Sequence, residues 1–336
     1  MFNPKAYLVK NLIDKKKLQA IPTRQGYGEG LVEAGKKDKN VVVLCADLSD
    51  STKSGMFRDA FPERFIETGI AEQNMMGLAA GLALAGKIPF ISTYAVFCPG
   101  INWSQLRVCV CQNDANVKLT GAHAGISVGP DGVSHQGLED IAITRCLPGL
   151  VVLAPCDSIE TKKATIAAAK WKGPVYLRFA REATPVFTSP KTPFKIGRAE
   201  VFRNGKDVTI IACGPLVYNA LIAAEKLAKE KIDVQVINNH TIKPMDEKTI
   251  IKAAQETGAI VTLEEHQVIG GMGSAVAEVL AKNLPAGRQV AQVPIEMIGI
   301  KDRWGESGTP DELIEKFGLG VDSIIKVVKK ALKRKK

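Results

Sequence analysis

The stretch Glu67-Thr68-Gly69-Ile70-Ala71-Glu72-Gln73-Asn74-Met75-Met76-Gly77 leads from a predicted strand into a predicted helix. Gly69 interrupts the strand, and residues 73–86 carry no charge and are rich in glycine and alanine. These small residues predict a buried helix at 70–85 whose backbone lies close to a neighbour. Glu72 is the last carboxylate before the buried part. Because an unpaired buried charge is costly, we expect Glu72 either to share a proton with a partner or to accept hydrogen bonds from amides at the helix N-terminus.

Strands and helices alternate on both sides of this stretch. Residues 41–45 form a continuous apolar run, which is typical of a parallel strand buried on both faces. Further strands are expected at 65–67, 88–93, 117–120, 150–154 and 175–179. Helices are expected at 23–37, 70–85, 101–112, 138–146 and 157–171. This alternation predicts one doubly wound, mainly parallel sheet.

A proline-rich segment at 183–197 predicts a linker to a second, smaller α/β unit. Its strands are expected at 208–213, 234–238, 259–263 and 293–298, its helices at 215–230, 247–257 and 271–283, and an exposed turn at 285–288. We therefore predict an α/β fold with two doubly wound, mainly parallel-sheet domains. The predicted divisions are a lead-in at 1–22, domains at 23–182 and 198–320 on either side of the linker, and a basic helix at 321–336.

The composition is that of an ordinary globular protein without a membrane span. The chain has 336 residues, of which 46% are hydrophobic and 6% aromatic, so full cores can form. The apolar runs are too short to cross a membrane, and residues 1–20 lack the apolar core of a signal peptide. The seven cysteines include no Cys-x-x-Cys pair. We therefore expect free thiols and a cytoplasmic protein.

The net charge of +10 is concentrated at the end of the chain, where seven of the last eleven residues are basic. Apolar residues alternate with them at helical spacing: Ile324, Ile325, Val327, Val328, Ala331 and Leu332. This pattern predicts an amphipathic helix with a solvated basic end. A nucleic-acid-binding or scaffolding protein that uses this basic helix is the non-enzymatic alternative, and steeply salt-dependent DNA binding would favour it.

Polar residues follow two of the predicted strands. Asp47 comes directly after one strand, and the long loop 121–137 after another carries His123, Asp131 and His135. The carboxyl ends of parallel strands meet at one edge of a sheet, where α/β proteins bind ligands. A long loop inside a compact domain is usually functional. The wide spacing of the two histidines does not match a metal-ligand pattern, so no metal site is predicted in this chain.

The run Gly69-Ile70-Ala71-Glu72-Gln73 and the loop from His123 to His135 resemble the C-terminal half of transketolase, the thiamine-diphosphate enzyme that moves two-carbon ketol units between sugar phosphates. The resemblance extends from Thr23 to about residue 320. It implies a pyrimidine-binding domain followed by a smaller C-terminal domain. It also implies that Glu72 is catalytic, because the matching Glu hydrogen-bonds the aminopyrimidine of the cofactor and favours the tautomer that takes the proton from the thiazolium carbon.

The resemblance implies further contacts with the cofactor. Tyr94 and Phe97 would enclose the aminopyrimidine, although two aromatics after a strand are, on their own, more often core residues. Gly100 stands where the family usually has a third aromatic residue, so one wall of the pocket is expected to be open or filled differently. Asp47 and Leu48 would lie beside the thiazolium ring.

The resemblance also implies a substrate site. Four residues would contact the phosphate of the sugar: Arg24, Ser51, His123 and Arg181. Asp131 would bind a substrate hydroxyl and His135 would lie near the reacting carbonyl, which makes His123 and His135 the other catalytic candidates. The alternative for the two arginines is local pairing, with Glu29 and Glu182 as the nearest carboxylates in sequence. Arg178 is a candidate for a structural role instead.

The magnesium and diphosphate motif of thiamine enzymes, Gly-Asp-Gly followed by a downstream Asn, is missing, and Gly129-Pro130-Asp131-Gly132 does not match it. The resemblance therefore implies that a separate N-terminal transketolase subunit holds Mg²⁺ and the diphosphate, while this chain binds the pyrimidine end of thiamine diphosphate. The expected assembly is a heterotetramer of two such pairs, with the helix from Gly69 in the contact between chains. Its sugar phosphates would belong to the pentose phosphate pathway or include a specialised ketose outside it.

Two related thiamine enzymes stay open as alternatives. A deoxyxylulose-phosphate synthase shares the Gly-Ile-Ala-Glu-Gln run and the pattern Asp131-Gly-x-x-His135-Gln, but that family usually lacks a histidine at the position of His123. The β subunit of a 2-oxo-acid dehydrogenase would have no use for the residues that contact phosphate.

Overall fold

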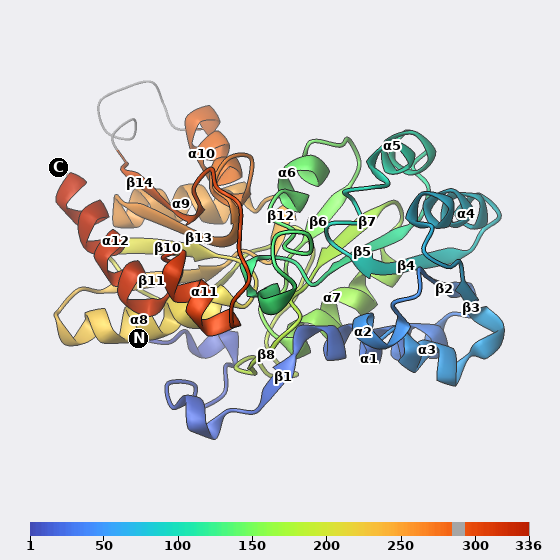
Figure 1. Ribbon diagram of the computed structural model, residues 1–336. Coiled ribbons are helices and arrows are strands. Elements are labelled where there is room, and N and C mark those ends of the chain that lie inside the picture. Colours follow the sequence, from blue (N-terminus) through green and yellow to red (C-terminus); the bar gives the residue numbers. More distant parts are fainter. Residues whose placement is uncertain (284–292, 336) are drawn as a thin grey trace.

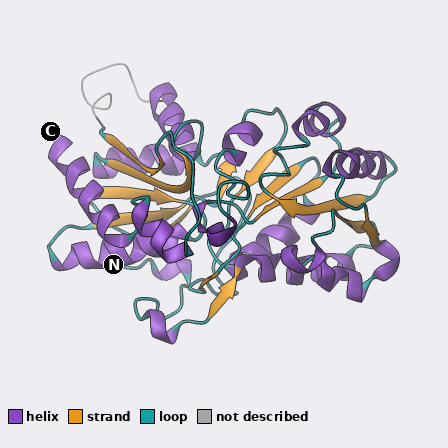
Figure 2. Ribbon diagram, in the orientation of Figure 1, coloured by secondary structure: helices purple, strands orange, loops and turns teal. Residues whose placement is uncertain are grey.

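The computed structural model describes residues 1–283 and 293–335 and consists of two α/β units, each a sheet with helices on both faces (Figures 1 and 2). The first unit is built on a seven-stranded sheet and the second unit on a five-stranded sheet. Both chain ends lie at the second unit (Figure 1). The predicted turn at 285–288 lies outside the described residues. None of the helices among the described residues is long and apolar enough to cross a membrane.

The sheet of the first unit has the strand order β12-β6-β7-β5-β4-β2-β3. Its strands are β2 (Val41–Cys45), β3 (Phe65–Glu67), β4 (Ile88–Tyr94), β5 (Lys118–Ala122), β6 (Val151–Leu153), β7 (Val175–Arg178) and β12 (Thr241–Lys243). The six predicted strands all form and pair in parallel, and most of them are buried on both faces. The seventh strand, β12, was not predicted; it comes from the second unit and pairs antiparallel with β6.

Helices cover both faces of this sheet. One face carries α1 (Thr23–Lys37), α3 (Gly55–Ala60) and α7 (Ser158–Lys170), and the other carries α4 (Glu72–Leu84), α5 (Trp103–Gln105) and α6 (Asp140–Arg145). The short helices α2 (Ser49–Thr52) and η3 (Pro62–Arg64) lie in the connections. The predicted helix at 101–112 is mostly the π-helix η4 (Leu106–Cys111), in a stretch whose valines and cysteines have low helix propensity.

The loop at 121–137 contains regular structure, which corrects the expectation of a loop without any. Strand β5 continues to Ala122, and the 3₁₀ helix η5 (Ile126–Asp131) follows. Helical geometry is broken at Gly129, whose φ of 81° lets two short turns meet at a kink. The sequence did not indicate this 3₁₀ helix, because glycine and proline within the loop argue against any helix.

Helix α4 is buried along one side only, which corrects the expectation of a buried helix. Met75 and Met76 are fully buried, whereas Leu84 is 69% exposed. Gly77 and Gly81 are exposed as well, and a Cβ atom at either position would have nothing within 4 Å. Among the described residues, the glycines of α4 therefore make no close contact with another element, because their side of the helix faces outward.

The sheet of the second unit has the strand order β14-β13-β10-β11-β9. Its strands are β9 (Glu200–Arg203), β10 (Val208–Ala212), β11 (Val234–Asn238), β13 (Ile260–Gln267) and β14 (Ile295–Ile300), and its helices are α8 (Leu216–Lys229), α9 (Glu247–Thr257), α10 (Met272–Asn283), α11 (Pro310–Lys316) and α12 (Val321–Arg334). The four strands and three helices predicted before residue 299 all form. Strand β9 was not predicted, since it is a short edge strand that pairs antiparallel with β11 through an irregular register.

The predicted lead-in and linker are packed parts of the fold. The lead-in contains the 3₁₀ helices η1 (Pro4–Ala6) and η2 (Lys15–Lys17), and Leu12 between them is buried in the core of the second unit. Strand β1 (Ala20–Pro22) then pairs antiparallel with β8 (Ala183–Pro185) of the predicted linker. Phe187, also in that segment, is fully buried. Both segments therefore tie the two units together.

The predicted basic helix is amphipathic, as expected, and it is an integral part of the second unit. Its residues Ile324, Val328 and Ala331 are fully buried in the core. On its outer side, Lys330 and Arg334 lie 2.9 and 2.6 Å from the carboxylate of Glu296. Part of the basic charge is thus neutralised within the chain.

His240 lies where the chain crosses from β11 in the second unit to β12 in the first. The residue is fully buried, and its ring stacks on Phe194 with 4.3 Å between ring centroids. Its Nδ1 lies 2.9 Å from Thr241 Oγ1, and no hydrogen-bond partner among the described residues reaches its Nε2. Burial lowers the pKa of His240 to about 3, so the folded chain keeps this ring neutral at physiological pH.

We expect His240→Phe to make folding less sensitive to acid. An unfolded histidine has a pKa of about 6.5, so between that pH and the folded pKa of about 3 only the unfolded wild-type chain takes up a proton, and stability falls with pH. Phenylalanine keeps the ring stacking and removes this titration. Relative to wild type, the unfolding free energy of the variant should rise by about 1.4 kcal/mol per pH unit below about pH 6. Urea denaturation at several pH values measures the unfolding free energy of both proteins. A difference between them that does not change with pH would contradict the lowered pKa of His240.

Candidate active site

Adjacent parallel strands of the first unit bring several sequence-predicted residues to one edge of the sheet. β2, β4, β5 and β7 are neighbours in that order, and their carboxyl ends lie at the same edge. Asp47 follows β2, Tyr94 ends β4, His123 follows β5 and Arg181 lies three residues beyond β7. Residues far apart in the chain therefore converge because of the parallel pairing.

The rings of Tyr94, Phe97, His123 and His135 form one cluster. Tyr94 and His123 have ring centroids 4.1 Å apart, and Tyr94 stacks with Phe97 at 5.8 Å. The His135 ring lies 6.0 Å from that of Tyr94 and 5.7 Å from that of Phe97. Phe97 and His135 are half-buried, so the cluster presents a partly open wall of rings.

His123 is the most deeply buried polar member of this cluster. It is 2% exposed, its backbone has a left-handed φ of 54°, and no described residue bonds its Nδ1. Burial, followed by the nearby charges of Arg24, Arg181 and His135, lowers the pKa of His123 to about 3. A neutral imidazole near two guanidinium groups can donate or accept a hydrogen bond without adding charge.

Arg24 reaches this region from α1. Its Nη1 donates to the backbone carbonyl of Ser51 at 2.9 Å, and its Nε is buried with no hydrogen-bond partner among the described residues. The alternative of local pairing with Glu29 does not apply, because Glu29 instead lies 3.6 Å from Lys162. Arg24 thus keeps an unfilled donor in a buried position.

Arg181 reaches the same region from the segment after β7. Its Nη1 donates to Asp131 and to the carbonyl of Val128, both at 3.0 Å. Its Nε lies 3.5 Å from Glu182, so local pairing with the neighbouring carboxylate does occur, alongside the shorter contact with Asp131. The sequence reasoning placed Arg181 and Asp131 in one site but did not predict that they pair with each other.

Glu72 is the first residue of α4 and is 6% exposed. Its Oε1 accepts a hydrogen bond from Thr93 Oγ1 at 3.3 Å, and its backbone carbonyl accepts one from Asn102 Nδ2 at 3.3 Å. The carboxylate therefore accepts its hydrogen bond from a hydroxyl on β4. The sequence had also allowed a hydrogen bond from an amide at the start of α4. One long bond leaves most of the accepting capacity of the carboxylate to a further donor.

Asp47, Leu48 and Ser51 lie in the turn after β2 and in α2. Asp47 has a left-handed φ of 56° and an exposed side chain, and its amide donates to Glu67 at 2.8 Å. Leu48 is half-buried and packs on the same core cluster as Tyr94. Ser51 meets Arg24 through its backbone carbonyl. The turn is thus held by backbone contacts, and its side chains remain near the edge of the sheet.

Gly100 is exposed, and its backbone cannot accommodate the third ring that the resemblance would place there. A Cβ atom at this position would lie 1.9 Å from the carbonyl oxygen of Val96, so any side chain requires the backbone to move. No third ring therefore stands at Gly100.

These residues suit the ring end of thiamine diphosphate. A buried carboxylate at Glu72, with the stacked rings of Tyr94 and Phe97 on the same sheet edge, fits a flat ring with hydrogen-bonding nitrogens. Among the described residues, no group of three or more His, Cys, Asp or Glu side chains could hold a metal ion. All seven cysteines are free thiols.

Two residues of the loop at 121–137 (the site loop) bond to the second unit, and these contacts were not predicted from the sequence. The amide of Ser127 donates to Glu265 Oε2 at 3.0 Å, and Gln136 Nε2 donates to the carbonyl of Glu306 at 2.9 Å. Glu265 lies near the carboxyl end of β13 in the run Glu264-Glu265-His266. Three polar residues at the end of an apolar strand were the available signal.

Comparison with known proteins matches residues 19–186 to the transketolase pyrimidine-binding domain and residues 197–324 to the transketolase C-terminal domain. A putative transketolase C-terminal section from Methanocaldococcus jannaschii is 46% identical over 313 residues, which are 93% of this chain and 96% of that protein. The 6-deoxy-6-sulfo-D-fructose transketolase subunit SqwH of Clostridium sp. (strain MSTE9) is 40% identical over 319 residues, 95% of this chain and 97% of that protein.

A solved structure described as a split gene transketolase, an inactive β4 tetramer, is similar along nearly the whole chain. The TM-score is 0.86 at 46% sequence identity, and the match covers 94% of this chain and 100% of that one. The predicted α/β class with two mainly parallel sheets is thus the fold that these relatives share.

Proposed function

The chain belongs to the transketolase family, and we propose that it is the C-terminal subunit of a split, thiamine-diphosphate-dependent transketolase that is active only with a separate N-terminal subunit. The proposed reaction transfers a two-carbon ketol unit from a ketose phosphate to an aldose phosphate. The observation that carries this proposal is that the buried His123 ring lies 4.1 Å from the ring of Tyr94, at the sheet edge that Arg181 and Arg24 also reach. That arrangement combines an anion-binding end with a ring-binding wall.

The proposed roles at the cofactor follow from burial and position. Thiamine diphosphate, when bound, supplies the nucleophilic carbon that carries the ketol unit. Glu72 would hold and release a proton at a ring nitrogen, since it is buried and has only a long bond to Thr93 among the described residues. Tyr94 and Phe97 would pack on the pyrimidine. Asp47 and Leu48 would lie near the thiazolium ring, where the turn after β2 places them.

The proposed substrate site lies at the cationic end of this edge. Arg24 and Arg181 would bind the phosphate of the sugar together with Ser51 and His123, because guanidinium groups bind phosphate oxygens well and Arg24 keeps a buried Nε with no partner among the described residues. Asp131, which now bonds Arg181, would bind a substrate hydroxyl, and His135 on the ring cluster would lie near the reacting carbonyl.

Pentose phosphates are the substrates that we propose, and a sulfonated ketose is the second candidate. The relative named a 6-deoxy-6-sulfo-D-fructose transketolase subunit is 40% identical to this chain, and a sulfonate is an anion that the same two arginines would suit. A comparison of phosphorylated and sulfonated donors at equal concentration separates the two candidates.

The exposed side of α4 supports a partner subunit. Ile70 and Leu84 are 82% and 69% exposed there, and Ile101 and Val108 near α5 are also exposed. Large exposed apolar side chains gathered in one region mark an interaction site. We propose that this region contacts the N-terminal subunit, which would hold Mg²⁺ and the diphosphate in a heterotetramer of two pairs. A related split gene transketolase is described as an inactive β4 tetramer.

The domain limits are part of this proposal. We assign 23–182 to the pyrimidine-binding domain and 198–320 to the C-terminal domain, joined by 183–197. The family matches at 19–186 and 197–324 support these limits. Apolar residues of the remaining ends, within 2–18 and 321–332, pack in the core of the second unit.

The purified chain alone should show no ketol transfer and should bind thiamine diphosphate weakly. Much of the binding energy for this cofactor comes from its charged end, and the chain lacks the motif that would hold it. Adding a subunit that contains Gly-Asp-Gly and a downstream Asn should restore ketol transfer, measured by a coupled transketolase assay, and tight binding of thiamine diphosphate, measured by calorimetry. Turnover by the single chain, free of host transketolase, would disprove the split-enzyme proposal.

Glu72→Gln should leave folding and subunit assembly intact and lower activity by at least about a hundredfold. Glutamine keeps the size and a hydrogen-bonding group but cannot exchange the proton that the proposed role requires. The measurement is hydrogen–deuterium exchange at the thiazolium carbon in the assembled enzyme. Glu63→Gln, at an exposed carboxylate of the same unit, is the matched control. Exchange at the wild-type rate in Glu72→Gln would assign Glu72 a structural role.

Arg181→Ala should raise the Michaelis constant for a phosphorylated donor such as xylulose 5-phosphate and scarcely affect hydroxypyruvate, which has no phosphate. Each lost charged hydrogen bond costs about 1.5–3 kcal/mol, hence roughly ten- to a hundredfold in catalytic efficiency. Arg198→Ala, at an exposed arginine that lies 3.9 Å from Asp246, is the matched control. Equal losses for the two donors would contradict the phosphate role and indicate a defect in folding or cofactor binding.

A further inference from the structure

The second unit holds the loop that carries three of the six proposed substrate-binding residues, His123, Asp131 and His135. Glu265 Oε2 accepts the amide of Ser127 at 3.0 Å. The loop backbone lies directly against this carboxylate, because a Cβ atom at Gly125 would lie 2.5 Å from the same oxygen. Gln136 at the far end of the loop donates to the carbonyl of Glu306. A segment of the first unit is thus positioned from the second.

The contact at Ser127 is one residue away from the contact that places Arg181. Val128, the next residue, accepts a hydrogen bond from Arg181 Nη1 at 3.0 Å, and Asp131 accepts another from the same atom at 3.0 Å. His123 lies four residues before Ser127 on the same loop. Movement of Ser127 would therefore displace the carbonyl and the carboxylate that orient Arg181.

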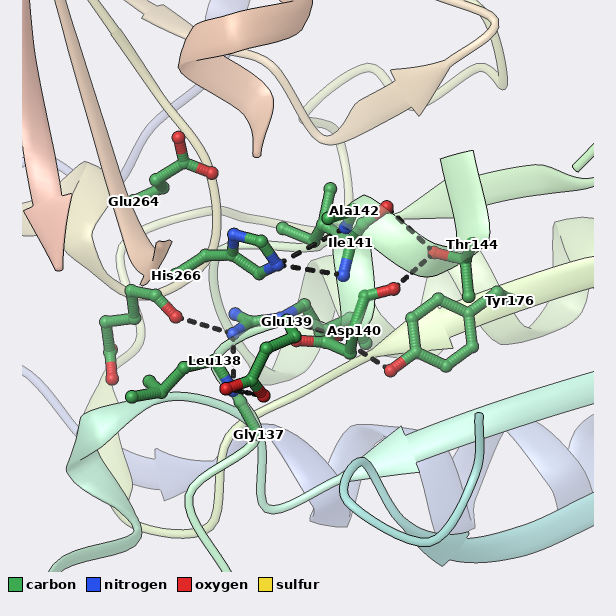
Figure 3. Close-up of polar contacts among 12 residues, drawn as sticks. Gly137, Leu138, Glu139, Asp140, Ile141, Ala142, Thr144, Tyr176, Glu264 and His266 are labelled. Carbon is green, nitrogen blue, oxygen red and sulfur yellow. Dashed lines mark hydrogen bonds and ion pairs between the residues drawn. The ribbon is translucent and has the colours of Figure 1, made fainter. Parts of the chain in front are cut away.

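Glu265 is itself fixed by neighbouring contacts. Its backbone carbonyl accepts Arg178 Nη2 at 2.6 Å, and Arg178 forms an ion pair with Asp140 at 2.8 Å. The next residue, His266, accepts the amides of Ile141 and Ala142 at the start of α6 through Nε2, as Figure 3 shows. These contacts hold the backbone, so replacement of the Glu265 side chain removes the loop contact and leaves the junction between the units in place.

We infer that Glu265 is a positioning residue, whose carboxylate holds the loop at Ser127 and thereby sets Arg181, His123 and Asp131 for an anionic substrate. The anionic substrate in this inference rests on the proposed function, whereas the contact between Glu265 and the loop does not depend on it. Burial raises the pKa of Glu265, while bonds from Ser127 and the charge of Arg178 oppose that shift. An uncharged acceptor of the same shape can therefore take its place, and Glu265→Gln should serve as the conservative rescue.

Three variants separate loop positioning from general destabilisation. Glu265→Ala removes the acceptor and leaves the amide of Ser127 without it. Glu264→Ala is the matched control, because Glu264 is also a buried carboxylate but bonds the amides of Met272 and Gly273 at the start of α10, within the second unit. Gly125→Ala keeps Glu265 and pushes the loop away from it, at a φ of 92° that also disfavours alanine.

The first measurement is amide hydrogen exchange of the full chain without partner or substrate. In Glu265→Ala and Gly125→Ala, peptides from the site loop should exchange about tenfold faster or more, which corresponds to one lost buried hydrogen bond. In Glu265→Gln, the amides of the site loop should exchange at nearly the wild-type rate. In Glu264→Ala, only the amides at the start of α10 should exchange faster. Unchanged loop exchange in Glu265→Ala, or an equal effect of Glu264→Ala on the loop, would overturn the inference.

The second measurement is steady-state kinetics of the assembled enzyme. Glu265→Ala should raise the Michaelis constant for a phosphorylated ketose about tenfold, with kcat changed less than about twofold, and Glu265→Gln should restore it. A proportionate fall in kcat for every donor, or no rescue by glutamine, would reject the positioning role. If no preparation transfers ketol units, the proposed function fails, and the exchange experiment still decides whether Glu265 holds the loop.

Discussion

The buried ion pair between Arg178 and Asp140 joins the parts of the molecule on which the site depends. Arg178 Nε lies 2.8 Å from Asp140 Oδ2, which also accepts the hydroxyl of Tyr176 at 2.8 Å. The same guanidinium donates to the carbonyls of Gly137 and Glu265, at the end of the site loop and on β13. Removing one partner of such a pair costs about 3–5 kcal/mol, because the other charge stays buried. Arg178 thus has the structural role that was expected for it, and one side chain fixes the loop, α6 and the second sheet together.

The two units share more than this contact. One hydrophobic cluster includes residues from both sheets, such as Leu119 and Ile237, and β12 extends the first sheet with a strand from the second unit. The edge that carries Tyr94 and His123 is therefore built by the first unit and held in shape by both. This sharing explains why a loop in the pyrimidine-binding part makes contacts with the transketolase C-terminal part, at Ser127 and at Gln136.

The sequence predicted the elements that bury apolar runs, and it missed those defined by contacts between distant segments. The run at 41–45 is a strand in any compact context, whereas Thr241–Lys243 and Ala183–Pro185 are strands only because partners lie beside them. The same distinction applies to the site. Parallel topology predicted that Asp47 and His123 would share an edge, but neither spacing nor composition reveals that Asp131 pairs with Arg181 fifty residues away. The apolar composition of α4 predicted a buried helix, but only one side is buried, and no described residue covers the exposed side.

The uncovered side of α4 has a consequence for how a cell must make this protein. Isolated chains carry the exposed Ile70 and Leu84 and the open glycines Gly77 and Gly81 into solution, and exposed apolar surface of this kind promotes association. Copies made in excess over their companion would bury it against one another. In the proposed split enzyme, matched synthesis of the two chains would keep this surface covered, because surplus copies of this chain would associate through it.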